Sequence, residues 1–186
     1  MAILPIYLDP QKILREMTED IDTKEISDKN LQDFILSMAE TMANAQGIGL
    51  AAPQVGSKRR ICIISYDIFA RETEKKEFNI KNYRPQNTQN SIVLINPYII
   101  KKSLRKIVLE EGCLSIPGIY GTVKRPREIK VKYIDIDGQE VMLTAGGWLS
   151  RVIQHEVDHL NGILFTDKII KYVSDKPTIP EYPYIK

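Results

Sequence analysis

The sequence predicts an α+β domain, in which two helical segments are combined with a series of strands. In residues 27–45 and 147–161, apolar side chains recur at the spacing of a helix. Five further segments are rich in β-branched or alternating apolar residues, which is typical of strands. These segments are residues 60–66, 91–100, 103–110, 128–136 and 139–144. Since 186 residues are enough for one hydrophobic core, we expect a single domain spanning residues 1–186.

The first helix has a recognisable start, end and buried face. We expect Ser27 to be its N-cap and Gly47 to stop it after about Ala45. Its apolar face includes two methionines, which we expect to be core residues rather than metal ligands. The face is formed by Leu31, Phe34, Ile35, Met38 and Met42.

The later elements also carry boundary signals. Asp137 and Gly138 are the turn signal of a β-hairpin between the last two predicted strands. Gly162 suits the position just past the end of the second helix. This helix has apolar faces made by Trp148, Leu149, Val152, Ile153 and Leu160.

Two segments fall outside these elements. Residues 67–90 are rich in charged residues, Asn and Gln, so we expect a surface insertion that is either a mobile loop or a cover over a cleft. Residues 171–186 form a tail with three prolines, which exclude a long helix.

The composition excludes several classes of protein. Hydrophobic residues make up 43% and charged residues 27%, as in ordinary globular proteins, and the net charge is only +2. No apolar run of 18 residues and no targeting leader is present, so we expect no membrane contact and a cytoplasmic location. Two cysteines do not make a disulfide framework.

Both histidines of the chain lie in one segment of the second helix, QHEVDHLNG. His155 and His159 are four residues apart, which places both imidazoles on one helix face. With Glu156 they form the HExxH pattern, typical of a metal site with its own general base. The pattern therefore predicts a metal site, although helix histidines also occur as ordinary core or surface groups.

A catalytic site of this kind needs a third protein ligand, and the chain has no third histidine. Cys62 lies in the apolar segment RICIISY, where we expect a buried core side chain. Cys113 lies in LEEGCLSIPG, where Gly112 allows close backbone approach and Pro117 with Gly118 indicates a loop. We therefore expect Cys113 to be the third ligand, with a buried inert thiol as the alternative.

The segment GIGLAAPQVG, residues 47–56, is too small and apolar to be a solvated linker. Its glycines indicate that the backbone packs closely against another part of the protein. Gln54 is its only polar side chain, and it either hydrogen-bonds the backbone or donates to a developing oxyanion.

Together, GIGLAAPQVG, EGCLS and QHEVDHLNG resemble the three signature motifs of the peptide deformylases. The resemblance extends from LPIYLDPQKILRE near the N-terminus to LFTD at residues 164–167. It implies mixed, mostly antiparallel sheets around a central metal-binding HExxH helix. It also implies a metallohydrolase acting on linear amides, which removes the formyl group from N-formylmethionine at the start of new polypeptides and releases formate.

The resemblance assigns roles to the metal cluster. It implies that Cys113, His155 and His159 hold the metal, and that metal-bound hydroxide attacks the formyl carbon. Glu156 then acts as general base and passes the proton to the departing amine.

Further residues are assigned around the reacting group. The Gln54 amide and the Leu114 backbone N–H are the expected donors to the oxyanion. In the family an arginine after the cysteine pairs with the acid inside the helix motif, which implies a pair of Arg125 with Asp158 here.

The substrate is expected in an extended slot, pairing with backbone at Ile48, Gly49 and Gly112. Positions that share the helix face of His155 are expected to form the methionine pocket with Ile48. These positions are Trp148, Arg151 and Val152. The Arg151 side chain either lies along the pocket with its guanidinium in water or faces solvent altogether.

The resemblance further implies one Fe²⁺ per chain, with Zn²⁺, Ni²⁺ or Co²⁺ as possible substitutes, since thiolate and imidazole ligands suit all four. The expected partners are N-formylmethionyl nascent peptides. We expect a monomer without sequence-specific nucleic-acid binding. Some bacterial relatives dock a C-terminal helix on the ribosome, and the proline-containing tail leaves such a contact near the exit tunnel open.

Two other functions are compatible with parts of the pattern. A zinc endopeptidase also uses HExxH, and Asp167 is then the candidate downstream ligand. A catalytically silent relative, acting as a metal sensor or binding module, is the other alternative.

Overall fold

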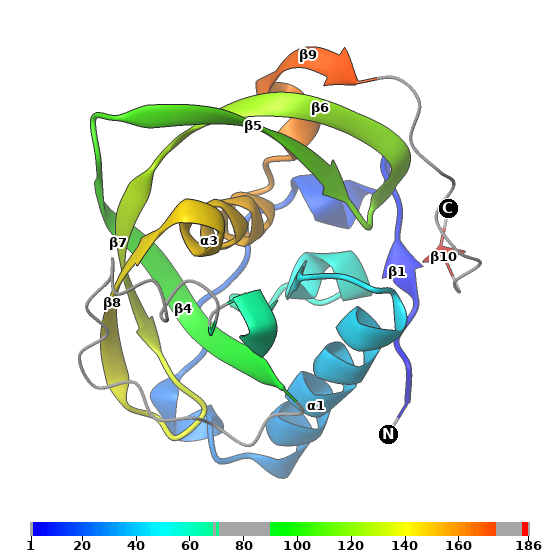
Figure 1. The fold of residues 1–186 in the computed structure, drawn as a ribbon. Helices are drawn as coiled ribbons and strands as arrows, with labels where there is room; N and C mark the ends of the chain where they lie inside the picture. Colours follow the sequence, from blue (N-terminus) through cyan, green and yellow to red (C-terminus); the bar gives the residue numbers. More distant parts are fainter. Residues whose placement is uncertain (1, 69, 71–89, 174–183, 186) are drawn as a thin grey trace.

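The computed structural model describes residues 2–68, 70, 90–173 and 184–185. Helix α3 (Gly147–Leu160) lies near the centre of the molecule, and strands of both larger sheets contact it (Figure 1). The two larger sheets are antiparallel throughout, whereas the smallest sheet is a parallel pair. The predicted α+β class, with mostly antiparallel sheets around the HExxH helix, is confirmed.

The described strands form three sheets. The five-stranded sheet has the order β2 (Gly49–Ala51), β3 (Ile61–Ser65), β4 (Ser91–Lys102), β7 (Glu128–Ile134) and β8 (Glu140–Gly146). The three-stranded sheet contains β5 (Lys106–Cys113), β6 (Ile116–Pro126) and β9 (Ile169–Val173). The third sheet pairs β1 (Ile6–Tyr7) with β10 (Tyr184–Ile185). Single 3₁₀ turns lie at Lys12–Arg15, Thr23–Glu25, Ala52–Val55 and Phe165–Lys168.

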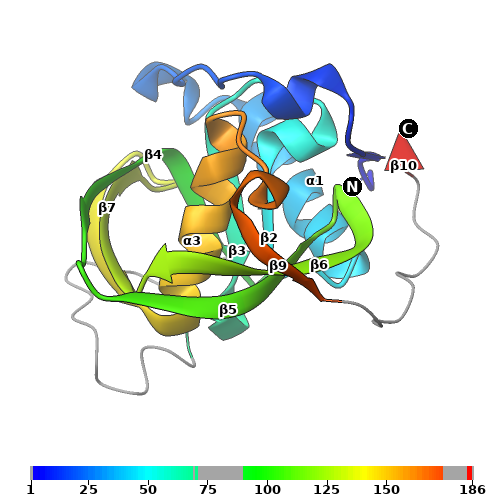
Figure 2. The same ribbon diagram turned by 90° about the horizontal axis from the view of Figure 1, so that it is seen from above.

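Strand β3 is buried on both of its faces, which explains its unbroken apolar sequence. Cys62 and Ile64 point into a cluster that includes α3 residues such as Ile153, whereas Ile61 and Ile63 point towards α1 (Lys29–Asn44). The five-stranded sheet is therefore covered by one helix on each side (Figure 2). The prediction that Cys62 is a core residue is confirmed, because its side chain is fully buried.

The N-terminus of α1 lies one residue later than predicted. Asp28, not Ser27, is the N-cap, and its carboxylate accepts a hydrogen bond from the Asn30 N–H at 2.6 Å. An ionised carboxylate is a stronger acceptor than a hydroxyl and also suits the positive end of the helix. Met38 and Met42 are buried in the core, as predicted.

The C-terminus of α1 also differs from the prediction. Gln46, not Gly47, adopts the left-handed conformation that ends the helix, with φ of 54°. The Gly47 N–H then donates to the Met42 carbonyl at 2.9 Å, which satisfies a carbonyl in the last turn of the helix.

The predicted hairpin between residues 128–136 and 139–144 is confirmed as β7 and β8. Gly138 has a φ of 79°, and its N–H donates to the Asp135 carbonyl at 3.0 Å. The end of α3 is also as predicted, since Gly162 follows it with a φ of 71°.

The region of Cys113 differs from the expected loop. Strand β5 begins at Lys106 rather than residue 103 and continues to Cys113, and β6 begins at Ile116. Pro117 and Gly118 therefore lie within β6, but at a register shift, because Cys113 pairs with Ile116 whereas Gly112 pairs with Tyr120. The proline and the glycine, whose φ is 78°, mark this irregularity of the strand rather than a loop between elements.

The first signature segment, expected as a loop, contains strand β2 and a 3₁₀ turn. Strands β1, β2, β6, β9 and β10 were not predicted, and all but β6 have five residues or fewer. Such short strands show little periodicity in sequence.

The predicted insertion 67–90 lies outside the described residues, except for 67, 68, 70 and 90. In the tail, residues 171–173 and 184–185 belong to strands, whereas residues 174–183 and 186 lie outside the description. Within the described part of the chain, no helix is long and apolar enough to cross a membrane.

Gly162→Ala should destabilise the protein more than Gly138→Ala. Both glycines have positive φ, but a Cβ at position 162 would lie 2.5 Å from the Arg15 carbonyl oxygen, whereas nothing lies within 4 Å at position 138. Backbone strain costs about 1 kcal/mol in both variants, and the collision should raise the loss for Gly162→Ala to about 3 kcal/mol. Urea unfolding at neutral pH measures both losses. Equal losses would show that the chain at Arg15 moves aside at no cost.

Candidate active site

Helix α3 places its two histidines and the intervening glutamate at the centre of the molecule. The rings of His155 and His159 have centroids 5.0 Å apart, as expected for positions one turn apart. The His159 side chain is buried, and Glu156 is 4% exposed. The helix is fixed there by buried apolar residues on its other faces, namely Leu149, Ile153, Val157 and Leu160.

Strand β5 brings Cys113 to this helix. The Cys113 Sγ lies 3.1 Å from His159 Nε2, and the three candidate ligand atoms of Cys113, His155 and His159 all lie within 4.8 Å of one another. Bonds of about 2.0–2.3 Å to one tetrahedral ion would place such atoms roughly 3–4 Å apart. A thiol and two imidazoles in this arrangement therefore fit a divalent transition-metal ion.

The carboxylate of Glu111 orients this cluster. His155 Nδ1 lies 3.0 Å from Glu111 Oε2. When the imidazole is neutral, an Nδ1–H that donates to Glu111 leaves the lone pair on Nε2, the other ring nitrogen. The His155 ring is thus oriented by a carboxylate, which is a common arrangement for histidines that bind metals.

Two arginines also converge on Glu111. Arg125 donates through Nε at 2.6 Å and Nη2 at 2.8 Å, and Arg151 donates through Nη1. Burial tends to raise the pKa of Glu111, but the hydrogen bonds from Arg125 and His155 outweigh it and hold that pKa well below its usual range. Glu111 is therefore a buried carboxylate that is charged at neutral pH.

Arg125 extends this network to the metal helix. Its Nη1 donates to Asp158 Oδ2 at 2.6 Å, and Lys168 donates to the same oxygen at 2.6 Å. The predicted pair of Arg125 and Asp158 is confirmed.

Arg151 lines the cavity, as one of the two expectations had it, but its guanidinium does not lie in water as both had it. Its side chain is 2% exposed, and its guanidinium donates to Glu111 and to the carbonyls of Val123 and Ile107. A buried carboxylate supplies the partner that makes this burial of a charge possible. Sequence alone did not indicate that partner.

Gln54 reaches the cluster from the 3₁₀ turn after β2. Its Oε1 accepts a hydrogen bond from the Ala51 N–H at 2.8 Å, which turns the amide NH₂ group towards β5. Its Nε2 lies 3.2 Å from Ser115 Oγ and 3.5 Å from Cys113 Sγ. Gln54 thus bonds the backbone, which was one of the two expectations, and it directs its NH₂ group towards Cys113 and Ser115.

Glu156 packs closely against β2. A Cβ on Gly49 would collide with the Glu156 carboxylate and lie 2.9 Å from a methyl group of Val152, so a larger residue there would displace Glu156. This is the close backbone approach that the glycines of the segment indicated. Glu156 Oε2 is buried, and it has no hydrogen-bond partner among the residues that the structure describes. Burial raises the pKa of Glu156 to about 7, although His155 and Arg125 oppose this effect. A cation at the neighbouring cluster would favour the carboxylate and lower that pKa.

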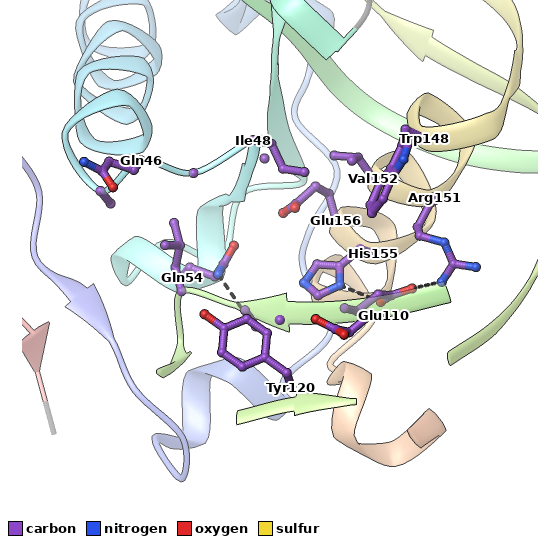
Figure 3. Close-up of a pocket in the computed structure, with 17 residues that line it drawn as sticks. Gln46, Ile48, Gln54, Glu110, Tyr120, Trp148, Arg151, Val152, His155 and Glu156 are labelled. Carbon is purple, nitrogen blue, oxygen red and sulfur yellow. Dashed lines mark hydrogen bonds and ion pairs between the residues drawn. The ribbon is translucent and has the colours of Figure 1, made fainter. Parts of the chain in front are cut away.

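These groups surround one cavity of about 520 Å³. Figure 3 shows Gln54 facing His155 and Glu156 across it, with Tyr120 at one side and Trp148 at another. Leu114 also lines the cavity, in the turn after β5. All six residues expected at the substrate slot and pocket line it, namely Ile48, Gly49, Gly112, Trp148, Arg151 and Val152. Ile48 and Trp148 are each 44% exposed.

Sequence reasoning missed Glu111 and several wall residues. Gln46, Glu110 and Tyr120 line the cavity, and the Tyr120 ring covers Gly112. The pair of glutamates directly before the Gly–Cys motif was a usable signal, because two acids at the end of an otherwise apolar strand need partners.

Asp167 was the alternative third ligand. It lies outside the cluster of Cys113, His155 and His159, and its carboxylate accepts hydrogen bonds from Arg15 and the Leu164 N–H. Asp167 therefore stabilises the 3₁₀ turn that follows α3.

Comparison with known proteins gives a consistent result. A family model of polypeptide deformylases matches residues 3–174. The peptide deformylase of Wolbachia sp. subsp. Drosophila simulans is 39% identical over 94% of this chain and 92% of its own length. That of Thermodesulfovibrio yellowstonii is 44% identical over 91% of this chain and 90% of its own length.

Solved structures of similar proteins have the same fold. The crystal structure of peptide deformylase from Thermotoga maritima matches with a TM-score of 0.75 and 34% identity, covering 91% of this chain and 99% of that one. The class I type b peptide deformylase from Acinetobacter baumannii, crystallised with Met-Ala-Ser, matches with a TM-score of 0.76 and 33% identity, covering 90% and 99%.

Glu111→Gln should destabilise the protein and weaken metal binding. Removing the charge leaves two buried guanidinium groups short of their carboxylate, which should cost about 3–5 kcal/mol of unfolding free energy. Loss of the group behind His155 should lower metal affinity about 10–100-fold. Glu110→Gln, the same change at the preceding position, is the control. Chemical denaturation and competition with a chelator measure the two effects.

The destabilisation by Glu111→Gln should depend on pH. Because the folded-state pKa of Glu111 lies below its unfolded value of about 4.3, its stabilising effect is complete above that pH and is lost on further acidification. The difference between wild type and variant should therefore shrink below about pH 4. A difference that stays constant down to pH 3 would contradict this role of its charge.

Proposed function

Because this chain belongs to the polypeptide deformylase family, we propose that it removes the formyl group from the N-terminal formylmethionine of newly made polypeptides and releases formate. The observation that carries the proposal is the convergence of Cys113, His155 and His159 within 4.8 Å, beside a buried Glu156. This arrangement supplies metal ligands, a proton carrier and a cavity in one place.

In the proposed site Cys113, His155 and His159 hold one divalent ion. We propose Fe²⁺ as the physiological ion and Zn²⁺ as the next candidate, with Ni²⁺ and Co²⁺ as substitutes. Such an ion supplies Lewis acidity and lowers the pKa of a water molecule towards neutrality. Glu111 keeps the His155 ring in position from behind.

Glu156 is the proposed proton carrier. It takes a proton from the attacking water and passes it to the nitrogen of the departing amine. Two features support this role: within the described part of the chain nothing donates a hydrogen bond to its Oε2, and burial raises its pKa. A raised pKa makes the carboxylate a stronger base than a solvated one, so it accepts a proton more readily.

The proposed oxyanion donors are the Gln54 side chain and the Leu114 backbone N–H. Gln54 is held from its oxygen side by the Ala51 N–H, so its NH₂ group stays near the cluster without reorganisation. Preorganised donors of this kind stabilise the charge that develops on the formyl oxygen.

The substrate is proposed to bind as an extended chain between two sheet edges. Among the described strands, β2 and β5 are each the last strand of their sheet, and Gly49 and Gly112 lie on them and line the cavity. Unpaired backbone groups at such edges can hydrogen-bond a peptide backbone whatever its side chains are. Ile48, Trp148 and Val152, with the buried stem of Arg151, then form the methionine pocket.

The proposed reaction sets the cellular context. Nascent N-formylmethionyl peptides are the partners, and the cytoplasm is the proposed location. A monomer is sufficient, because every proposed site residue comes from one chain.

Replacing the proposed catalytic groups should separate turnover from metal binding. Glu156→Ala should abolish nearly all release of formate from formyl-Met-Ala-Ser while the metal content stays normal. Gln54→Leu should lower kcat by about 10²–10³-fold, because one oxyanion donor is lost. Anaerobic assays with elemental analysis measure both quantities.

Wild-type protein and Gln139→Leu, the same change at an exposed position outside the cavity, serve as controls for this experiment. A fully active Gln54→Leu variant would remove Gln54 from the mechanism. If metal-loaded wild-type protein released no formate but cut peptides internally, the endopeptidase function would be favoured instead.

Removal of the ion should inactivate the protein reversibly. A chelator should abolish formate release, and Fe²⁺ added without oxygen should restore it, whereas Cys113→Ala should neither retain nor regain a stoichiometric ion. Metal analysis after gel filtration tests this, with Cys62→Ala as the matched control. Retention of one tightly bound ion by Cys113→Ala would exclude Cys113 as a ligand.

A further inference from the structure

The C-terminal strand β10 lies against the N-terminal strand β1. The two strands pair in parallel, with Ile6 opposite Tyr184 and Tyr7 opposite Ile185, and the Leu8 N–H donates to the Ile185 carbonyl at 2.8 Å. Among the described strands, β10 is the only one that pairs with β1. Figure 1 shows this pair at the edge of the molecule, close to the turn between β5 and β6.

The chain directly after β1 is bonded to that turn. The Asp9 N–H donates to the Ser115 carbonyl at 2.9 Å. Consecutive N–H groups of an extended chain point to opposite sides. Leu8 and Asp9 therefore connect the C-terminal strand on one side to the turn containing Leu114 on the other.

A layer of side chains makes the same connection. Ile6, Leu8 and Ala45 form a buried cluster, and both Leu114 and Tyr184 pack against it. Ala45 and Leu114 also line the active-site cavity. The Tyr184 side chain thus supports the wall of the cavity from behind, although it does not itself line the cavity.

Strand β1 also supports the other residues of the site. The Tyr7 side chain packs against the cluster that contains Cys113, and its ring covers Gly56 at the end of the turn that carries Gln54. A displacement of β1 would therefore also shift one proposed metal ligand and both proposed oxyanion donors.

We propose that Tyr184 and Ile185 are positioning residues for catalysis, which hold β1 against the turn at residues 113–115 and thereby fix the Leu114 N–H. The proposal rests on the proposed function, in which this N–H is an oxyanion donor. Removing such a donor costs about 10²–10³-fold in rate, so a partial displacement should cost about tenfold.

The test is Tyr184→Ala, assayed below the unfolding temperature of every variant. Its kcat should fall about tenfold, while KM stays within about twofold and the metal content is unchanged. Tyr184→Phe keeps the ring and should retain near wild-type kcat. Tyr172→Ala is the matched control, because it removes a tyrosine that is 65% exposed on β9.

A second readout does not depend on activity. In ¹⁵N-labelled, zinc-loaded protein, the amide signals of Leu114 and Ser115 should shift in Tyr184→Ala and stay unchanged in Tyr172→Ala. A general loss of stability would not produce this pattern, because it would not select the turn.

The outcomes separate the two proposals. If wild-type protein releases no formate, the proposed function fails, whereas shifts at Leu114 would still support the link to β10. If wild type is active and Tyr184→Ala matches it in kcat, the positioning role is overturned. Loss of metal in parallel with kcat, or a Phe variant as impaired as the Ala variant, would also overturn it.

Discussion

The structure of the site depends on one buried negative charge, that of Glu111. The carboxylate receives hydrogen bonds from two arginines and lies 3.0 Å from His155 Nδ1. Glu111 lies on β5 and its partners come from β6 and α3, so a single side chain joins the three-stranded sheet to the central helix. Burying any one of these charges alone would cost free energy, and the neighbouring opposite charges offset that cost. The position of Cys113, two residues along the same strand, follows from that connection.

A second constraint is that the site is assembled from segments far apart in sequence. The Gln54 turn, the end of β5 and helix α3 meet because the five-stranded sheet is held between α1 and α3, while β5 and β6 pass over the helix (Figures 1 and 2). The cavity then opens between the outer strands β2 and β5 of the two larger sheets. Strand edges beside a reactive cluster suit a substrate that is recognised by its backbone and one end.

Much of this site could be predicted from sequence because its chemistry is concentrated in short motifs. The spacing of His155 and His159 predicted a shared helix face, and the elimination of Cys62 as a core residue left Cys113. Gly49 was recognised as a point of close approach, although its neighbour Glu156 was not identified. The two main helices and the β7–β8 hairpin were predictable from periodicity and a turn signal.

The remaining features depend on partners that a sequence does not display. Arg151 was expected in water, and the structure buries it because Glu111 and two carbonyls lie within reach. Pro117 and Gly118 indicated a loop, but they lie at a register shift inside β6, which otherwise pairs with β5. The contact of the C-terminal strand with β1 joins residues more than 170 positions apart, and two-residue strands have no periodicity to detect.

Two buried carboxylates lie beside the same pair of histidines, and their surroundings give them opposite properties. Glu111 is surrounded by donors that hold its pKa well below the usual range, so it remains charged and serves as a fixed support. Glu156 has one oxygen that no described residue hydrogen-bonds, and burial raises its pKa to about 7. Two acids whose pKa values are separated in this way can have different roles, one as a fixed support of the site and one as a group for proton transfer. The division follows from the arginines, which reach Glu111 with their guanidinium groups and leave Glu156 facing the cavity.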